Sequence, residues 1–285
     1  MFCRARSSEA LKSTVDNEGR DNMQKFWIWL DELICSTAWK IEPPKSYGLF
    51  HLVYAVGGIL LCLFLARWLS RLGEKGNRRL LFGIGMFLLI AEVYKQLLMY
   101  FNFGDHSIVW YALPFQLCSI PMYFCLITPF LKEGRVRHAM YCFMSTFNLL
   151  GGVSAIIEPS GVFGDCLMLT IHSCIWHMLL VFIGLYLIVS GRGVKNMRDY
   201  WASVVTFLIL CAIAFGINVI FGNVSDRSIN MFFVGPWRTT LVVFSTIYDK
   251  FGWIVSTSLY IPVVCLGAYV VYLLIRLYQN CRHRR

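Results

Sequence analysis

Residues 165–190 read DCLMLTIHSCIWHMLLVFIGLYLIVS, an apolar run long enough to cross a lipid bilayer as one helix. About 20 apolar residues are needed to span roughly 30 Å of hydrocarbon. Other runs share this character, and we expect spans at Tyr47–Leu69, Leu80–Phe101, Ser107–Leu131, His138–Pro159, Asp165–Ser190, Tyr200–Phe221 and Ile254–Tyr278. The sequence therefore predicts an all-α membrane protein, built as a bundle of seven transmembrane helices.

Composition supports the membrane class. Of the 285 residues, 58% are hydrophobic and 15% are charged, whereas a soluble domain has about 25% charged residues. We expect a polar N-terminal tail with an interfacial helix over residues 1–46, the transmembrane domain over 47–278, and a basic tail over 279–285. The interfacial helix is expected at Lys25–Lys40, whose aromatic residues suit the level of the lipid headgroups.

The basic residues predict the orientation of the bundle. They follow alternate spans and end the chain, at Arg71, Lys75, Arg78, Arg79, Lys132, Arg135, Arg137, Arg192, Lys195, Arg198, Arg282, Arg284 and Arg285. The positive-inside rule then places the C terminus in the cytoplasm and the N terminus outside, although Arg227, Arg238 and Lys250 fall on the outer side. Since the net charge of +10 collects at span ends, we expect no nucleic-acid partner. The cell membrane is the first expectation for location, and an internal eukaryotic membrane is the alternative.

Polar side chains interrupt several spans and outline a candidate site. They are Glu92, Lys95, Cys118, Asn148, His172 and His177. Each ionisable group in hydrocarbon costs roughly 2.5–3.5 kcal/mol on insertion scales, so such groups normally face a bundle interior or a cavity. At a helical rise of ~1.5 Å per residue, the depths of Glu92, Cys118, Asn148 and His177 all fall at about 14–18 Å. This agreement predicts one cavity shared by four helices.

Cys118 is the candidate nucleophile, because a thiolate forms at lower cost than an alkoxide. His177 at matched depth is the candidate base. Pro114 and Pro121 flank Cys118 and are expected to open the helix around it, since each removes an amide donor and frees a carbonyl. The alternative is a packing cysteine in a kinked span.

The remaining candidates have supporting roles. Ser173, four residues before His177, is expected to orient it. Asn148 or Gln116 is expected to stabilise an oxyanion, while Glu92 and Lys95, three apart, are expected to neutralise each other. His172 and His177 are five apart and do not share a helix face, and no Cys-x-x-Cys pair is present. We therefore expect neither a metal nor a cofactor, and simple interhelical hydrogen bonds are the alternative for either histidine.

Several segments, in order, resemble the YwaF-like and transmembrane protein 164 family of seven-span integral membrane acyltransferases. They are Glu92-Val93, Leu113-Pro114-Phe115-Gln116-Leu117-Cys118, Asn148-Leu149-Leu150-Gly151-Gly152 running to Pro159, Ile171–His177, and Gly235-Pro236-Trp237. The resemblance implies acyl transfer between glycerophospholipids, with a cysteine acyl-enzyme and a histidine base in the eukaryotic branch. It also implies membrane phospholipids and lysophospholipids as partners.

The chain departs from the eukaryotic pattern at the nucleophile. That branch looks like Asn-Pro-Cys-His, so its cysteine position is Phe115 here. The chain looks more like the bacterial Leu-Pro-x-His-Leu-Cys pattern, with Gln116 in place of the histidine. We expect Cys118, one helical turn beyond Phe115 on the same face, to reach the same cavity. The alternatives are a non-catalytic lipid or amphiphile transporter or receptor, and an intramembrane esterase; the acyl chain and headgroup stay open.

Overall fold

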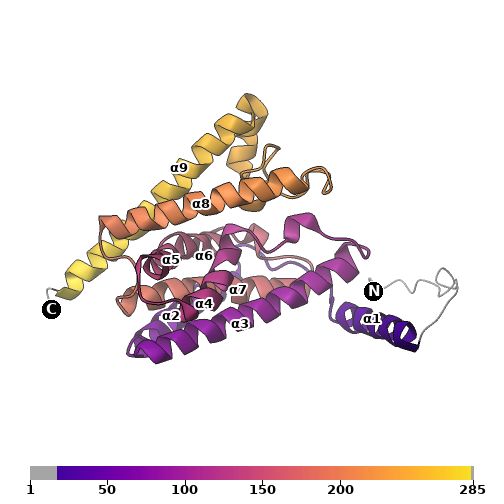
Figure 1. The fold of residues 1–285 in the computed structure, drawn as a ribbon, viewed down its shortest axis with the longest axis horizontal. Coiled ribbons are helices and arrows are strands. Elements are labelled where there is room, and N and C mark those ends of the chain that lie inside the picture. The colour runs from indigo at the N-terminus through magenta and orange to yellow at the C-terminus, as the bar shows by residue number, and fades with distance from the viewer. Residues whose placement is uncertain (1–17, 284–285) are drawn as a thin grey trace.

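The structure is a computed structural model that describes residues 18–283, and over that range it is all-helical with no β-strand (Figure 1). Its α-helices are α1 (Glu18–Ser36), α2 (Leu49–Leu69), α3 (Glu74–Leu98), α4 (Ile120–Ile127), α5 (Arg135–Ser145), α6 (Phe147–Ile157), α7 (Leu167–Val189), α8 (Met197–Phe221) and α9 (Val242–His283). The part of the predicted polar tail before Glu18 lies outside the described residues. The prediction of an all-helical chain is confirmed.

Within residues 18–283, six helical stretches are long and apolar enough to cross a membrane. They are Leu49–Leu69, Glu74–Phe103, Arg135–Ile157, Leu167–Val189, Met197–Phe221 and Val242–Arg282. Each overlaps one of the expected spans, so hydropathy located six of them. A membrane protein with several spans is therefore the class that the fold supports.

The third expected span, Ser107–Leu131, is not a continuous helix. Only Leu117–Phe130 forms a short apolar helical stretch, which at ~1.5 Å per residue is about 21 Å long. That falls short of the roughly 30 Å needed to span hydrocarbon. The break lies at Pro114, since Leu113 before it has an extended ψ of 145°, as expected for a residue that precedes proline.

The expected span His138–Pro159 contains a break between α5 and α6. Thr146 has φ −120° and ψ −80°, outside the helical region. The hydroxyls of Ser145 and Thr146 both donate to the carbonyl of Cys142, at 3.0 and 2.8 Å. Serine and threonine that bond back to the preceding turn often bend helices. The bend places Asn148 at the start of α6, in the middle of the bundle.

The interior of the bundle is formed by α5, α6 and α7. Helix α6 packs on α7, α7 packs on α2, and α5 packs on α8, while α4 packs on α3 (Figure 1). Phe143, Phe147 and Phe207 are fully buried and stack in a row, with ring centroids 5.5 and 4.6 Å apart. Since α2 exposes most of its apolar side chains, it forms an outer, lipid-facing wall.

Helix α9 reverses direction near its start. Gly252 has φ 78° and ψ 176° and separates a first arm from the long C-terminal helix. The two arms lie side by side, because the Ser256 hydroxyl donates to the carbonyl of Phe244 at 2.9 Å and Phe244 contacts Tyr260 with ring centroids 5.3 Å apart. The expected last span, Ile254–Tyr278, is contained in the second arm.

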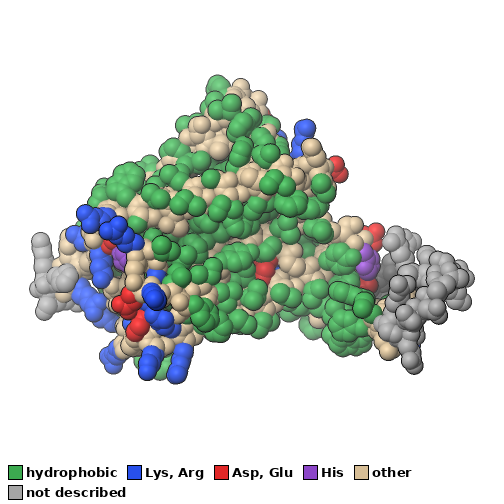
Figure 2. Space-filling view, in the orientation of Figure 1, with side chains coloured by type: hydrophobic (Ala, Val, Ile, Leu, Met, Phe, Trp, Pro, Cys, Tyr) green, Lys and Arg blue, Asp and Glu red, His purple; other side chains and the backbone are tan. Residues whose placement is uncertain are grey.

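Helix α1 overlaps the expected interfacial helix and exposes Phe26, Trp27 and Trp29. It lies beyond the end of α3 that is far from the C terminus (Figure 1). Lysine and arginine side chains gather at the other end of the bundle, near the C terminus, and hydrophobic side chains cover the flank between (Figure 2). The interfacial position of α1 and the orientation of the termini stay predictions.

Candidate functional site

Cys118 lies in a single turn of 3₁₀ helix, Leu117–Ser119, between the break at Pro114 and α4. Its side chain is partly buried. Its main-chain carbonyl accepts a hydrogen bond of 2.9 Å from the indole of Trp176 on α7, and the same turn packs against α6. The thiol therefore lies on irregular backbone inside the bundle. At membrane depth such backbone is tolerated where it is buried in protein or lines a cavity.

A buried ion pair lies on α3 beside this turn. The Nζ of Lys95 is 2.7 Å from the Oε1 of Glu92, whose side chain is 4% exposed. The same oxygen accepts a hydrogen bond of 2.7 Å from Gln96, which also donates to the carbonyl of Ala112 at 2.6 Å. The predicted pairing is formed, and it also anchors the segment that leads to the cysteine.

His172 lies on α7 and is partly buried. Its ring stacks on Trp176 with centroids 5.1 Å apart, and its buried Nε2 has no hydrogen-bond partner among the described residues. The two rings line an apolar groove of about 130 Å³ between α3 and α7. The groove opens to the side of the bundle, because Phe87 and Ile175 on its walls are exposed.

His177 is held by its own helix. Its Nδ1 lies 2.8 Å from the main-chain carbonyl of Ser173, so Ser173 orients the ring through its backbone rather than its hydroxyl. A carbonyl only accepts hydrogen bonds, so Nδ1 carries the proton and the Nε2 of the neutral ring keeps a lone pair. This is the tautomer that a general base requires.

The thiol of Cys118 and the ring of His177 are not directly bonded. No hydrogen bond joins them within the described part of the chain, and the neighbouring Trp176 makes the contact to Cys118 instead. Helix α6 approaches His177 closely, since a Cβ placed on Gly152 would lie 3.2 Å from its carbonyl. Both residues therefore border α6, on two different elements.

Asn148 links α6 to α7. It is 1% exposed, and its Nδ2 donates to the carbonyls of Met144 and Leu180, both at 3.0 Å. Its Oδ1 is buried without a partner among the described residues. Reversing the amide would set an oxygen against two carbonyls, so this orientation is the one the network supports. Asn148 therefore offers a spare acceptor, whereas the predicted oxyanion role requires a spare donor.

Gln116 holds the loop that precedes α9. Its Nε2 donates to the carbonyl of Asn230 at 3.0 Å, and its Oε1 accepts from the backbone N–H of Phe232 at 2.9 Å. These two bonds fix the loop over the segment before Cys118. The side chain that was predicted to assist an oxyanion has a positioning role in this arrangement.

Phe115, which the resemblance puts at the position of the eukaryotic-branch cysteine, packs in an aromatic cluster. Its ring centroid lies 5.9 Å from that of Phe232 and 6.4 Å from that of Tyr123, and the hydroxyl of Tyr123 donates to the carbonyl of Pro114 at 2.7 Å. The prediction that Phe115 and Cys118 share one helix face is wrong, because residues 113–116 are not helical.

Sequence reasoning missed two residues of this site, Gln96 and Trp176, which make the contacts given above. Gln96 had a signal, since it follows Glu92 by four residues on a helix. Trp176 had none, because its contact depends on how α7 meets the Cys118 turn.

Side chains able to hold a metal ion lie apart from this site. Within the described residues they are His138, Cys142 and Asp199, whose ligand atoms lie within 4.8 Å of one another. The spacing of four between His138 and Cys142 is a sequence signal that both side chains share one helix face.

The fold and the site define a class: an all-helical membrane protein with several spans, whose interior holds a thiol beside a buried ion pair. The TMEM164 family model matches residues 46–278, and the chain belongs to this family. The matched range includes all the predicted site residues. No curated protein matches the chain, and no solved structure matches it.

Proposed function

We propose that this chain is an integral membrane lipid acyltransferase, which moves an acyl chain between glycerophospholipids through a thioester on Cys118. The observation that carries the proposal is the setting of the thiol. It lies on a single 3₁₀ turn inside the bundle, next to the Trp176 ring that lines a laterally open groove. The segment that leads to this turn is anchored through Gln96 to the Glu92–Lys95 pair. A cysteine that only packs needs none of these neighbours.

In the proposed first half-reaction, the ester carbonyl of a donor phospholipid reaches Cys118. The thiol proton passes to the Nε2 of His177, and the sulfur bonds to the carbonyl carbon. The ester C–O bond then breaks, and the lysophospholipid oxygen takes the proton from the imidazolium. Catalytic hydrogen bonds often tighten only in the substrate complex, so the bond between Cys118 and His177 is expected to form when substrate binds.

In the second half-reaction the hydroxyl of an acceptor lysophospholipid attacks the thioester and gives its proton to His177. The C–S bond breaks, the thiol is restored, and a new phospholipid leaves. Lys95 is the proposed oxyanion stabiliser, because an ammonium has three donors and only one is needed for Glu92. Lys95 takes the oxyanion role that was predicted for Asn148, since both N–H groups of the Asn148 amide already donate to carbonyls.

The support for the reaction class comes from the resemblance described in the sequence analysis. The resemblance implies acyl transfer through a cysteine, and here the family's eukaryotic position holds Phe115, whose side chain has no nucleophile. Cys118 is the cysteine three residues further along the same irregular segment. Membrane phospholipids and lysophospholipids are the proposed substrates, with no soluble cofactor.

The decisive experiment uses purified protein in lipid nanodiscs with a phospholipid labelled in one acyl chain and an unlabelled lysophospholipid acceptor. Cys118→Ala is expected to abolish transfer and labelling by a thioester trap. Cys125→Ala is the matched control, because Cys125 is a fully buried cysteine on the adjoining α4. Transfer by Cys118→Ala at the wild-type rate would end the proposal.

A second candidate function is non-catalytic binding or transport of an amphiphile. It is favoured by an apolar groove of about 640 Å³ between α5 and α8, which Arg135 and Arg198 border among apolar residues. An acyl chain beside an anionic headgroup fits such a surface. Lipid binding or flux that survives Cys118→Ser, without any labelled product, would favour this function over the enzyme. Release of free fatty acid instead of a new phospholipid would identify an esterase.

A further inference from the structure

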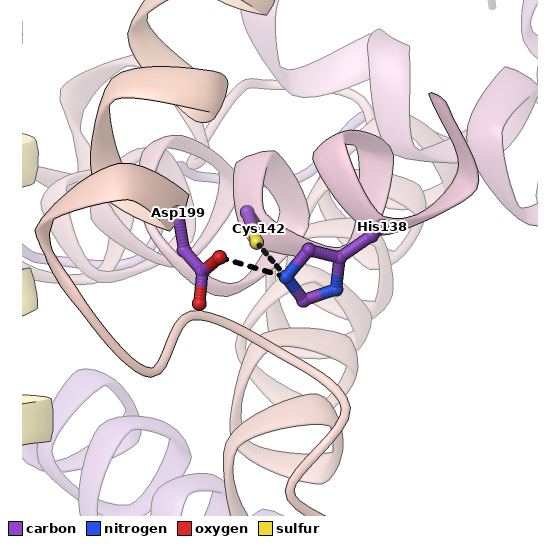
Figure 3. A group of neighbouring side chains, drawn as sticks. All are labelled: His138, Cys142 and Asp199. Carbon is purple, nitrogen blue, oxygen red and sulfur yellow. Dashed lines mark hydrogen bonds and ion pairs between the residues drawn. The ribbon is translucent and has the colours of Figure 1, made fainter. Parts of the chain in front are cut away.

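Three metal-ligand side chains converge where α5 meets α8 (Figure 3). His138 and Cys142 are four residues apart on α5, so they share one face of that helix, and Asp199 comes from the first turn of α8. The Nε2 of His138 lies 2.9 Å from the Oδ1 of Asp199 and 3.4 Å from the Sγ of Cys142. The three ligand atoms therefore all lie within 4.8 Å of one another.

Both contacts end on the same ring nitrogen (Figure 3). A ring nitrogen carries either one proton or one lone pair. With a lone pair, the Nε2 of His138 can accept from the Cys142 thiol but faces the lone pairs of the Asp199 carboxylate. With a proton, it donates to Asp199 and has no lone pair left for the thiol. A cation among the three atoms binds a lone pair from each, so it satisfies all of them at once.

Neighbouring groups already orient Asp199. Its Oδ2 accepts a hydrogen bond of 2.8 Å from the backbone N–H of Lys195, and its own N–H donates to the Oδ1 of Asn196 at 3.1 Å. These contacts leave Oδ1 directed at His138. Groups that orient ligands in this way are a regular part of metal sites. Cys142 is fully buried on α5, so its position is fixed by packing.

We propose that His138, Cys142 and Asp199 bind a zinc ion and leave its fourth coordination position to water. Zinc accepts sulfur, imidazole nitrogen and carboxylate oxygen together. Bond lengths of about 2.3, 2.0 and 2.0 Å in a tetrahedron put ligand atoms about 3.3–3.6 Å apart. The 3.4 Å between the Cys142 and His138 ligand atoms fits this range. The 2.9 Å between the His138 and Asp199 ligand atoms has to increase by about half an ångström when the ion binds.

Charge and access fit the same ion. The Cys142 thiol loses its proton on binding, so a thiolate and the Asp199 carboxylate balance the two positive charges of zinc. The His138 side chain is 41% exposed and borders a polar cavity of about 240 Å³, which Glu133 and Lys195 also line. The cavity is the route by which the ion enters and the space for its water. The site joins α5 to α8 and does not depend on the proposed acyl transfer.

The test is metal content and spectroscopy of the full-length protein in detergent, after dialysis against a chelator and reloading with zinc or cobalt alone. Wild type is expected to retain about one zinc per chain. Its cobalt form is expected to show a thiolate-to-metal charge-transfer band, and zinc is expected to raise its Tm. Cys142→Ser, His138→Ala and Asp199→Asn are each expected to reduce zinc content at least tenfold and to remove the Tm rise.

Cys125→Ser is the matched control, since it replaces a fully buried thiol outside the cluster, and it is expected to retain zinc and the cobalt band. His138→Ala keeps the test usable if a buried variant fails to fold, because this ring is partly exposed. Wild type that holds no zinc after reloading, or a cobalt band that persists in folded Cys142→Ser, would overturn the proposal.

Discussion

The indole of Trp176 donates a hydrogen bond to the main-chain carbonyl of Cys118 at 2.9 Å while its ring stacks on His172. One side chain of α7 thus holds the irregular turn that carries the thiol and forms a wall of the groove beside it. The contact joins residues 58 positions apart in the sequence. It makes Trp176 a positioning residue for the proposed nucleophile.

Trp176→Phe keeps an aromatic ring and removes the donor. The buried carbonyl of Cys118 then loses its partner, which costs about 1–3 kcal/mol. We expect a lower Tm in detergent and an acyl-transfer rate reduced by about tenfold. Trp253→Phe is the control, because Trp253 stacks on Phe215 outside the site. Wild-type stability and rate in Trp176→Phe would contradict the assignment.

Removing one charge of the ion pair on α3 is expected to cost more stability than removing both charges. Glu92→Gln leaves the ammonium of Lys95 without its counter-charge, and loss of one partner of a buried pair costs about 3–5 kcal/mol. The double variant Glu92→Gln/Lys95→Met is expected to recover most of that stability. Thermal unfolding of both single variants and the double variant measures the coupling. Simple additivity would show that the two charges are independently solvated.

Asn148→Leu tests the link between α6 and α7. The substitution keeps volume and removes the donors to the carbonyls of Met144 and Leu180. Interhelical hydrogen bonds inside membrane bundles contribute about 0.6–1.7 kcal/mol, so we expect a fall in Tm of that order. Stability equal to wild type would mean that the two carbonyls find other partners.

Gly252→Ala tests the reversal of α9. At φ 78° and ψ 176° the backbone is in a region that only glycine adopts readily, and another residue there costs about 1–3 kcal/mol. We expect a lower Tm and loss of proximity between Phe244 and Ser256, measured by disulfide trapping of paired cysteines. Gly216→Ala in α8 is the control, where an added Cβ meets nothing within 4 Å and the change favours the helix.

Six spans could be located from the sequence, because hydropathy over about 20 residues reports burial in lipid directly. The same average failed at Ser107–Leu131, where apolar residues are plentiful and the backbone is broken at Pro114. A hydropathy average does not register that a proline interrupts the helix. It also missed the bend at Thr146, whose cause is two hydroxyls that compete for one carbonyl.

The site could be predicted only where its contacts are local. The pairing of Glu92 with Lys95 follows from a spacing of three on a helix, and it is formed. The partners of Gln116, Asn148 and Trp176 lie on other elements, so no spacing in the sequence revealed them. The bond from His177 to Ser173 is local, but its acceptor is a backbone carbonyl that every residue possesses. The spacing of four between His138 and Cys142 is visible in the sequence. The third member of the cluster, Asp199, lies on another helix, so no spacing reveals it.

The two hydrogen bonds from Gln116 to Asn230 and Phe232 can form only late in the synthesis of the chain. Its two bonds reach across 114 and 116 positions, so the irregular segment before Cys118 enters the membrane long before its partners are synthesised. Until the loop after α8 has been synthesised, the side chain of Gln116 lacks these two partners. A nascent chain that stops before Asn230 is therefore expected to keep the Trp176 contact to the Cys118 turn and to lack the two bonds of Gln116.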